Sequence, residues 1–320
     1  MVDLHSSTDR PVDAVSEQRA AFERHRLDLF ARHGFDAEST WFRDAAGRRT
    51  YAMTGGAGSC PKIMIHGGLS EGSEWWPLAG RLPGRVVVPD RPGCGLTYIS
   101  NPRRRGFRRD AIDWMAHLVD ALDAPQVDLI GNSMGGYFSI VFALAHPDRV
   151  RRLVLVGAPA GLHRSLPRMI RLWGHPVVGR VISHRPIDDP EQLRSIFRRF
   201  LVTNADTIPT DALQVMVDGA ALPGVGRYAF LMLRRLTNLR GVRPDQLITS
   251  EMSRLGVPTR FVWGEDDAFC RPDAADDVWK LMPNAELRRI PKAGHVPQLD
   301  RPDEVADAVA SFLDDPKSRD

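Results

Sequence analysis

The most informative stretch of this sequence is Val127-Asp128-Leu129-Ile130-Gly131-Asn132-Ser133-Met134-Gly135. It begins as a short apolar run, typical of a strand buried on both faces, and a helical pattern follows from Gly135 to Ala145. A Gly-x-Ser-x-Gly sequence therefore lies between a predicted strand and a predicted helix. The glycines permit a sharp turn that exposes the Ser133 hydroxyl at the positive end of the helix. This context predicts a nucleophilic serine.

Similar apolar runs occur on both sides of this stretch. Each is short, and helical patterns such as Ala111 to Leu122 lie between them. Strands that alternate with helices predict a parallel sheet with right-handed crossovers. We therefore expect an α/β fold with a mostly parallel twisted sheet and helices on both faces. The predicted strands are 62–66, 85–90, 127–131, 152–157, 259–264 and 285–290, and a last helix begins at Pro302.

The alternation of strands and helices stops in the middle of the chain. From about Ala160 the sequence becomes helical and rich in arginine, with thirteen arginines and seven acidic residues up to Asp245. This excess of six positive charges could either attract substrates with a carboxylate or phosphate or be spread over solvated faces. The predicted division is an N-terminal leader helix within 1–40, a core formed by 41–159 and 251–320, and an inserted helical cap at 160–250.

The composition indicates a folded protein without a dedicated nucleic-acid surface. The chain is 43% hydrophobic and 26% charged, and its 43 basic and 40 acidic residues leave a net charge of only +3. The densest basic run, Arg103-Arg104-Arg105 with Arg108-Arg109, is typical of a solvated loop. We therefore expect a small-molecule substrate and no nucleic-acid partner, and a homo-oligomer is possible.

The cysteines and the N-terminus bear on the location of the protein. Cys60, Cys94 and Cys270 are odd in number and widely spaced, which fits neither a disulfide framework nor a metal site. Residues 1–10 have no apolar stretch typical of a signal peptide, and no run of about 20 apolar residues could span a bilayer. These observations predict a cytoplasmic protein.

A serine hydroxyl needs a base, and the base needs an acid that orients it. His295 follows the last predicted strand, so it is expected on a loop at the same edge of the sheet as Ser133. The preceding strand is followed by three carboxylates, and spacing alone does not choose among Glu265, Asp266 and Asp267.

With these residues in place, the chain resembles the α/β-hydrolase superfamily over about 41–158 and 255–314. The shared features are the serine turn, His66-Gly67-Gly68, Asp90-Arg91-Pro92-Gly93-Cys94-Gly95, Trp-Gly-x-x-Asp at 263–267 and the Gly-His near the end. The resemblance implies that Asp267 is the acid of a Ser133, Asp267 and His295 triad. It also implies an oxyanion hole formed by the backbone amides of Gly68, or the adjacent Leu69, and Met134. His66 is expected to support that loop.

The resemblance leaves three functions open. The preferred interpretation is a serine hydrolase of an ester, thioester or lactone that forms an acyl-enzyme on Ser133. The first alternative is a carbon–carbon bond hydrolase of aromatic ring-cleavage products, because Gly-Asn-Ser-Met-Gly-Gly is the turn of many such enzymes; these relatives tend to have Trp where this chain has Val296. The second is a slow, hydrolase-like small-molecule binding protein. No nucleotide-binding glycine motif is present, so no cofactor is expected. The serine turn has no aspartate nucleophile, which argues against dehalogenase and epoxide hydrolase activity.

Overall fold

The computed structural model describes residues 12–44, 47–68, 70–97, 106–183 and 187–314. Leu69 and the basic run Arg103-Arg104-Arg105 lie outside the described residues. Within the described part of the chain, no helix combines the length and the apolar character that crossing a membrane requires.

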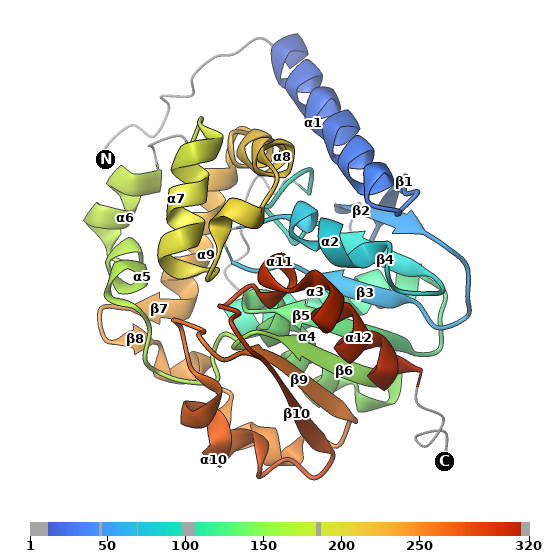
Figure 1. Cartoon of the computed structure of the whole chain (residues 1–320), viewed down its shortest axis with the longest axis vertical. Helices are drawn as coiled ribbons and strands as arrows, with labels where there is room; N and C mark the ends of the chain where they lie inside the picture. Colours follow the sequence, from blue (N-terminus) through green and yellow to red (C-terminus); the bar gives the residue numbers. More distant parts are fainter. Residues whose placement is uncertain (1–11, 45–46, 69, 98–105, 184–186, 315–320) are drawn as a thin grey trace.

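An eight-stranded sheet forms the centre of the molecule (Figure 1), in the order β1-β2-β4-β3-β5-β6-β9-β10. Strand β2 pairs antiparallel with both neighbours, β1 and β4, and the remaining pairs of the sheet are parallel. The expected α/β class and mostly parallel sheet are therefore confirmed. The strands are β1 (Glu38–Arg43), β2 (Arg49–Gly55), β3 (Lys62–Ile65), β4 (Val86–Pro89), β5 (Val127–Asn132), β6 (Val150–Val156), β9 (Thr259–Gly264) and β10 (Ala285–Ile290).

Side chains of the central strands alternate between two apolar clusters, one on each face of the sheet. Met64 and Ile130 belong to one cluster, whereas Ile63 and Leu129 belong to the other, and all four are fully buried. Helices cover both clusters, as expected for a sheet buried on both faces. Helices α1 (Val12–Arg32), α2 (Trp76–Ala79), α11 (Pro297–Asp300) and α12 (Pro302–Leu313) cover the first, and α3 (Phe107–Ala121), α4 (Met134–Ala145) and α10 (Asp276–Trp279) cover the second.

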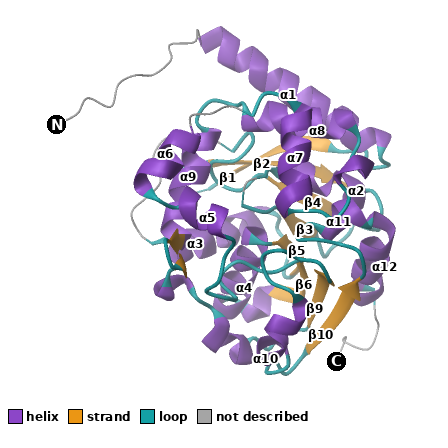
Figure 2. Ribbon diagram, turned by 60° about the vertical axis from the view of Figure 1, so that its left-hand side comes forward, coloured by secondary structure: helices purple, strands orange, loops and turns teal. Residues whose placement is uncertain are grey.

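Residues 157–258 join β6 to β9 and are called the α5–α9 segment below (Figure 2). The sequence predicts helices here, but the structure adds a hairpin, β7-β8. With two residues in each strand, this hairpin is too short for the alternating pattern on which strand prediction depends. The elements are α5 (Arg168–Trp173), α6 (Pro176–Ser183), α7 (Pro190–Phe200), α8 (Thr210–Ala220), α9 (Val225–Leu236), β7 (Thr237–Asn238) and β8 (Gly241–Val242).

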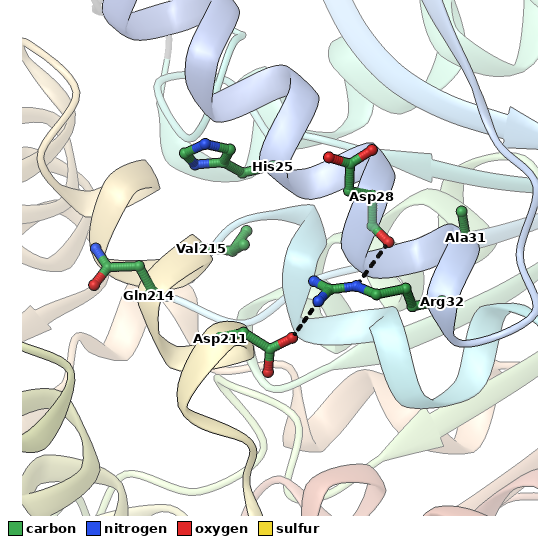
Figure 3. A pocket seen from close by; sticks show the side chains of 7 residues that line it. All are labelled: His25, Asp28, Ala31, Arg32, Asp211, Gln214 and Val215. Carbon is green, nitrogen blue, oxygen red and sulfur yellow. Dashed lines mark hydrogen bonds and ion pairs between the residues drawn. The ribbon is translucent and has the colours of Figure 1, made fainter.

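Helix α1 lies against α8 and so contacts the α5–α9 segment as well as the core (Figure 3). Arg32 forms an ion pair with Asp211 at 2.9 Å, and His25 Nδ1 lies 3.0 Å from the Asp218 carboxylate. The two helices border an open cavity of about 500 Å³. None of its lining residues belongs to the loops of Ser133, Asp267 or His295, so this cavity is not the candidate active site.

Candidate active site

Ser133 occupies a tight turn between β5 and α4. Its backbone has φ 50° and ψ −108°, a combination that is rare for a residue with a side chain. A Cβ on Gly135 would lie 2.0 Å from the Ile65 carbonyl oxygen, and one on Gly131 would lie 2.7 Å from backbone atoms of Gly135. The turn therefore requires glycine on both sides and holds the half-buried Ser133 at the N-terminus of α4.

His295 and Asp267 form a buried pair after β10 and β9. The Nδ1 atom of His295 lies 3.0 Å and 2.9 Å from the two carboxylate oxygens of Asp267. This carboxylate also accepts hydrogen bonds from the backbone N–H groups of Ala158 (2.9 Å) and Phe269 (2.8 Å), and the Phe269 ring stacks on the imidazole. These contacts fix the orientation of the imidazole relative to the Asp267 carboxylate.

The other two carboxylates of this loop have different surroundings. Asp266 is exposed and lies 3.9 Å from the Arg271 guanidinium, and Glu265 is half-buried. Asp267 is only 1% exposed. The structure therefore brings one of the three candidates, Asp267, to His295.

Asn132 connects the serine turn to the histidine loop. Its buried amide donates to the carbonyl oxygens of Val156 (2.8 Å) and His295 (3.0 Å). Gly157 makes room for this contact, since a Cβ there would lie 2.3 Å from the His295 oxygen. Asn132 thus links the ends of β5 and β6 to the loop of the candidate base.

Gly68 and Met134, the expected oxyanion-hole residues, are neighbours. A Cβ on Gly68 would lie 3.3 Å from Met134 Cε. The preceding residue is equally confined, because a Cβ on Gly67 would lie 2.7 Å from Asn132 Oδ1 and 3.7 Å from Ser133 Cβ. The Gly67-Gly68 backbone therefore passes directly beside the serine.

Two buried side chains hold this glycine loop from opposite sides. Both carboxylate oxygens of Glu74 accept the Gly67 N–H at 3.1 Å, and burial raises the pKa of Glu74 to about 7. Arg91 donates to the carbonyl oxygens of His66 (3.0 Å) and Gly67, and it contacts Met134 Sδ at 3.2 Å. No carboxylate among the described residues lies within ion-pair distance of Arg91.

His66 has the supporting role expected from the sequence. It is fully buried, and its Nε2 accepts the Arg91 backbone N–H at 2.9 Å, which leaves Nδ1–H to donate to the Gly67 carbonyl at 3.0 Å. Burial, together with the nearby Arg91 charge, lowers the pKa of His66 well below its usual value. A neutral imidazole therefore joins the loops after β3 and β4.

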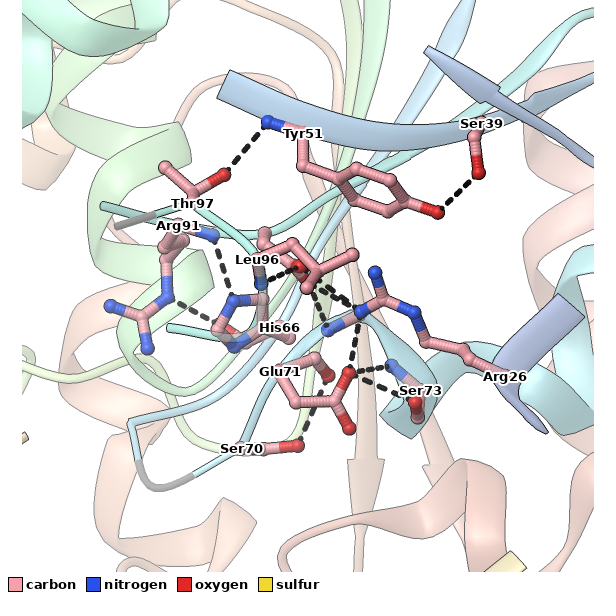
Figure 4. A network of polar contacts seen from close by, with 12 residues as sticks. Arg26, Ser39, Tyr51, His66, Ser70, Glu71, Ser73, Arg91, Leu96 and Thr97 are labelled. Atoms are coloured by element: carbon pink, nitrogen blue, oxygen red, sulfur yellow. Dashed lines mark hydrogen bonds and ion pairs between the residues drawn. The ribbon is translucent and has the colours of Figure 1, made fainter. Parts of the chain in front are cut away.

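Arg26 of α1 binds side chains of the same two loops (Figure 4). It is fully buried and donates to Glu71 at 2.9 Å and to both oxygens of Asp90 at 2.8 and 3.0 Å. Asp90 in turn accepts the backbone N–H groups of Gly72 and Leu96. The leader helix is thus part of the support of the glycine loop.

Asp300 connects the histidine loop to the α5–α9 segment. Its carboxylate accepts backbone N–H groups of Gly294 (2.7 Å), Thr203 (2.9 and 3.0 Å) and Asn204 (3.0 Å). The N–H of Val296 donates to the Leu201 carbonyl at 2.9 Å. The Val296 backbone is therefore held directly by Leu201, which follows α7, and the Gly294 backbone is held through Asp300.

Comparisons with known proteins show which family the chain is similar to. The profile described as "Alpha/beta hydrolase family" matches residues 63–308. A 2-hydroxy-6-oxo-2,4-heptadienoate hydrolase from Pseudomonas putida is 37% identical over 283 residues, which cover 84% of this chain and 94% of the relative. A 2-hydroxy-6-oxononadienedioate/2-hydroxy-6-oxononatrienedioate hydrolase from Cupriavidus pinatubonensis is 28% identical, with 83% and 90% covered.

The structure of carboxylesterase CesB from Bacillus subtilis has the same fold. It superposes with a TM-score of 0.71 at 22% identity and covers 93% of this chain and 99% of its own. At this identity the likeness concerns the fold.

Proposed function

Because the chain belongs to the alpha/beta hydrolase family and is therefore a hydrolase of this fold, we propose that it acts through a nucleophilic Ser133. His295 is the general base and Asp267 its orienting acid. The observation that supports this assignment best is the buried His295–Asp267 pair. Asn132, the last residue of β5 before Ser133, donates a hydrogen bond to the His295 carbonyl oxygen.

In the proposed reaction, His295 takes the proton of Ser133 while the serine oxygen attacks a substrate carbonyl. The backbone amides of Gly68 and Met134 stabilise the oxyanion, and the buried Arg91 guanidinium adds positive charge beside Met134. Collapse of the tetrahedral intermediate breaks the bond to the leaving group, which receives the proton from His295. Water then attacks the acyl-serine with His295 again as base, which releases the acid and restores Ser133.

For the substrate, we propose a 2-hydroxy-6-oxo-dienoate formed by aromatic ring cleavage, so that the broken bond is carbon–carbon. We prefer this substrate to the ester that the sequence alone favours, because two relatives of the chain are named as hydrolases of such dienoates. Ketonisation must precede cleavage: the 2-hydroxyl loses its proton and the carbon next to the 6-oxo group gains one. When the carbon–carbon bond breaks, conjugation with the 2-oxo group stabilises the negative charge on that carbon.

Ester hydrolysis is the second candidate because of the residue that follows His295. The residue after His295 is the aliphatic, buried Val296 rather than tryptophan. A cytoplasmic location and a small-molecule substrate belong to the same proposal, and the three unpaired cysteines support a reducing compartment.

The test uses one protein preparation and two substrates. We expect a higher kcat/KM for 2-hydroxy-6-oxo-2,4-heptadienoate than for a short p-nitrophenyl ester, and loss of both activities in Ser133→Ala. A reversed preference would select the ester hydrolase. Turnover of both substrates by Ser133→Ala at the wild-type rate would exclude the serine mechanism itself.

A further inference from the structure

Helix α6 of the α5–α9 segment exposes its apolar side. Val177, Val178 and Val181 fall on one face at helical spacing and are 66%, 36% and 56% exposed. On the opposite side, a Cβ on Gly179 would lie 1.9 Å from the Trp173 carbonyl oxygen and 2.3 Å from the Phe230 ring. The helix therefore packs through its glycine and presents its valines to the surroundings.

The neighbouring helices of the segment bury their apolar side chains. Helix α7 buries Leu193 and Phe197, and α9 buries Met232 and Leu233. The adjoining helix α5 also exposes an apolar side chain, Leu172, which is 44% exposed. Exposed apolar side chains gathered on two adjoining helices are typical of a binding surface.

The stretch of chain that forms this face carries charge of one sign. Between Arg149 and Ile187 the sequence contains no aspartate or glutamate. Arg164, Arg168 and Arg180 are exposed, and no carboxylate of the described residues forms an ion pair with Arg164 or Arg168. Exposed apolar and arginine side chains on the same two helices, with Arg168 in α5 and Arg180 in α6, fit a surface that offers both hydrocarbon and negative charge.

We propose that the face formed by α5 and α6 docks on an anionic lipid surface. Val177, Val181 and Leu172 enter the boundary between headgroups and acyl chains, and the arginines contact lipid phosphates. A second copy of the chain fits this face less well, because a twofold contact would place the same arginines opposite each other. Figure 1 shows α5 and α6 at the left edge of the molecule, outside α9 and on the side away from α12.

Vesicle flotation with the full-length protein tests the proposal. We expect binding to mixed phosphatidylcholine and phosphatidylglycerol vesicles, little binding to phosphatidylcholine alone, and weaker binding at high salt. Val177→Ser with Val181→Ser should lower the affinity for the mixed vesicles at least about tenfold. Arg164→Gln with Arg168→Gln should lower the affinity and reduce its dependence on salt.

Matched controls lie elsewhere on the surface. Leu281→Ser changes a side chain that is 66% exposed, as Val177 is, and Arg288→Gln changes an exposed arginine; neither should affect binding. Thermal melts of all variants report whether the fold is intact. Absence of binding, equal binding to neutral vesicles, or no effect of the valine changes would overturn the proposal. So would a valine-dependent dimer in sedimentation velocity without vesicle binding, which would assign the face to a second copy.

Discussion

Asp267 and Asp266 are adjacent in the sequence but differ in burial and in contact with His295. Asp267→Asn should lower kcat by up to about four orders of magnitude, because the amide favours the wrong imidazole tautomer. Asp266→Asn should leave kcat near the wild-type value. Steady-state kinetics on either candidate substrate measures this, and the opposite ranking would show that the wrong acid has been assigned.

Glu74 should make stability depend on pH. Its pKa rises from 4.5 to about 7 on burial, so the native state holds a proton that the unfolded state has already lost within this window. The free energy of unfolding therefore falls as pH rises from about 4.5 to about 7, by at most roughly 3 kcal/mol from this group.

Glu74→Gln keeps an acceptor for the Gly67 N–H and removes the titration. In urea denaturation, its free energy of unfolding relative to wild type should increase from pH 5 to pH 7 and stay constant above. The exposed Glu38→Gln is the control. A Glu74→Gln difference that does not change with pH contradicts this account.

At the residue scale, sequence reasoning could find groups that belong to a pattern in the chain. Ser133 is predicted from its glycines and His295 from its position after a strand. The position after β9 leaves Glu265, Asp266 and Asp267 open, and only the family resemblance implies Asp267. Asn132, Glu74 and Arg91 were not assigned roles, because their contacts join segments far apart in the sequence. One signal in the sequence could have drawn attention to Asn132, because it is a polar residue at the end of an apolar strand.

Helix α1 contributes its buried arginine to the loops after β3 and β4. Arg26→Met should destabilise the protein by about 3–5 kcal/mol, because Glu71 and Asp90 would stay buried without their cation. Arg32→Met, which removes an exposed ion pair of the same helix, should cost less than about 1 kcal/mol. Urea denaturation compares the two. Partial recovery in Arg26→Met with Glu71→Gln and Asp90→Asn would identify unpaired charge as the cause, and equal effects of Arg26→Met and Arg32→Met would exclude it.

The helix itself was predictable, and its docking was not. Phe22, Arg26 and Leu29 share one face of α1, and all three are buried. An arginine on an apolar face was the available signal, but its two carboxylate partners come 45 and 64 residues later. Periodicity describes a helix and contains no information about such partners.

Asp300 connects two distant parts of the molecule, the histidine loop and the α5–α9 segment. Asp300→Asn replaces the charged acceptor of three backbone N–H groups by a neutral one. This change should lower the free energy of unfolding by about 2 kcal/mol. We also expect a lower kcat, because the loop that contains His295 loosens. The exposed Asp303→Asn should change stability by no more than about 0.5 kcal/mol and leave kcat unchanged. Unaltered kcat in Asp300→Asn would show that the loop keeps its position without this contact.

The order of the chain delays completion of the site during synthesis. The strained serine turn is synthesised well before the proposed base, because His295 comes 163 residues after Asn132. The strand before His295, β10, also lies at one edge of the sheet, where it pairs with β9. A product that terminates before β10 therefore contains the proposed nucleophile without its proposed base, and the site can form only after His295 has been synthesised.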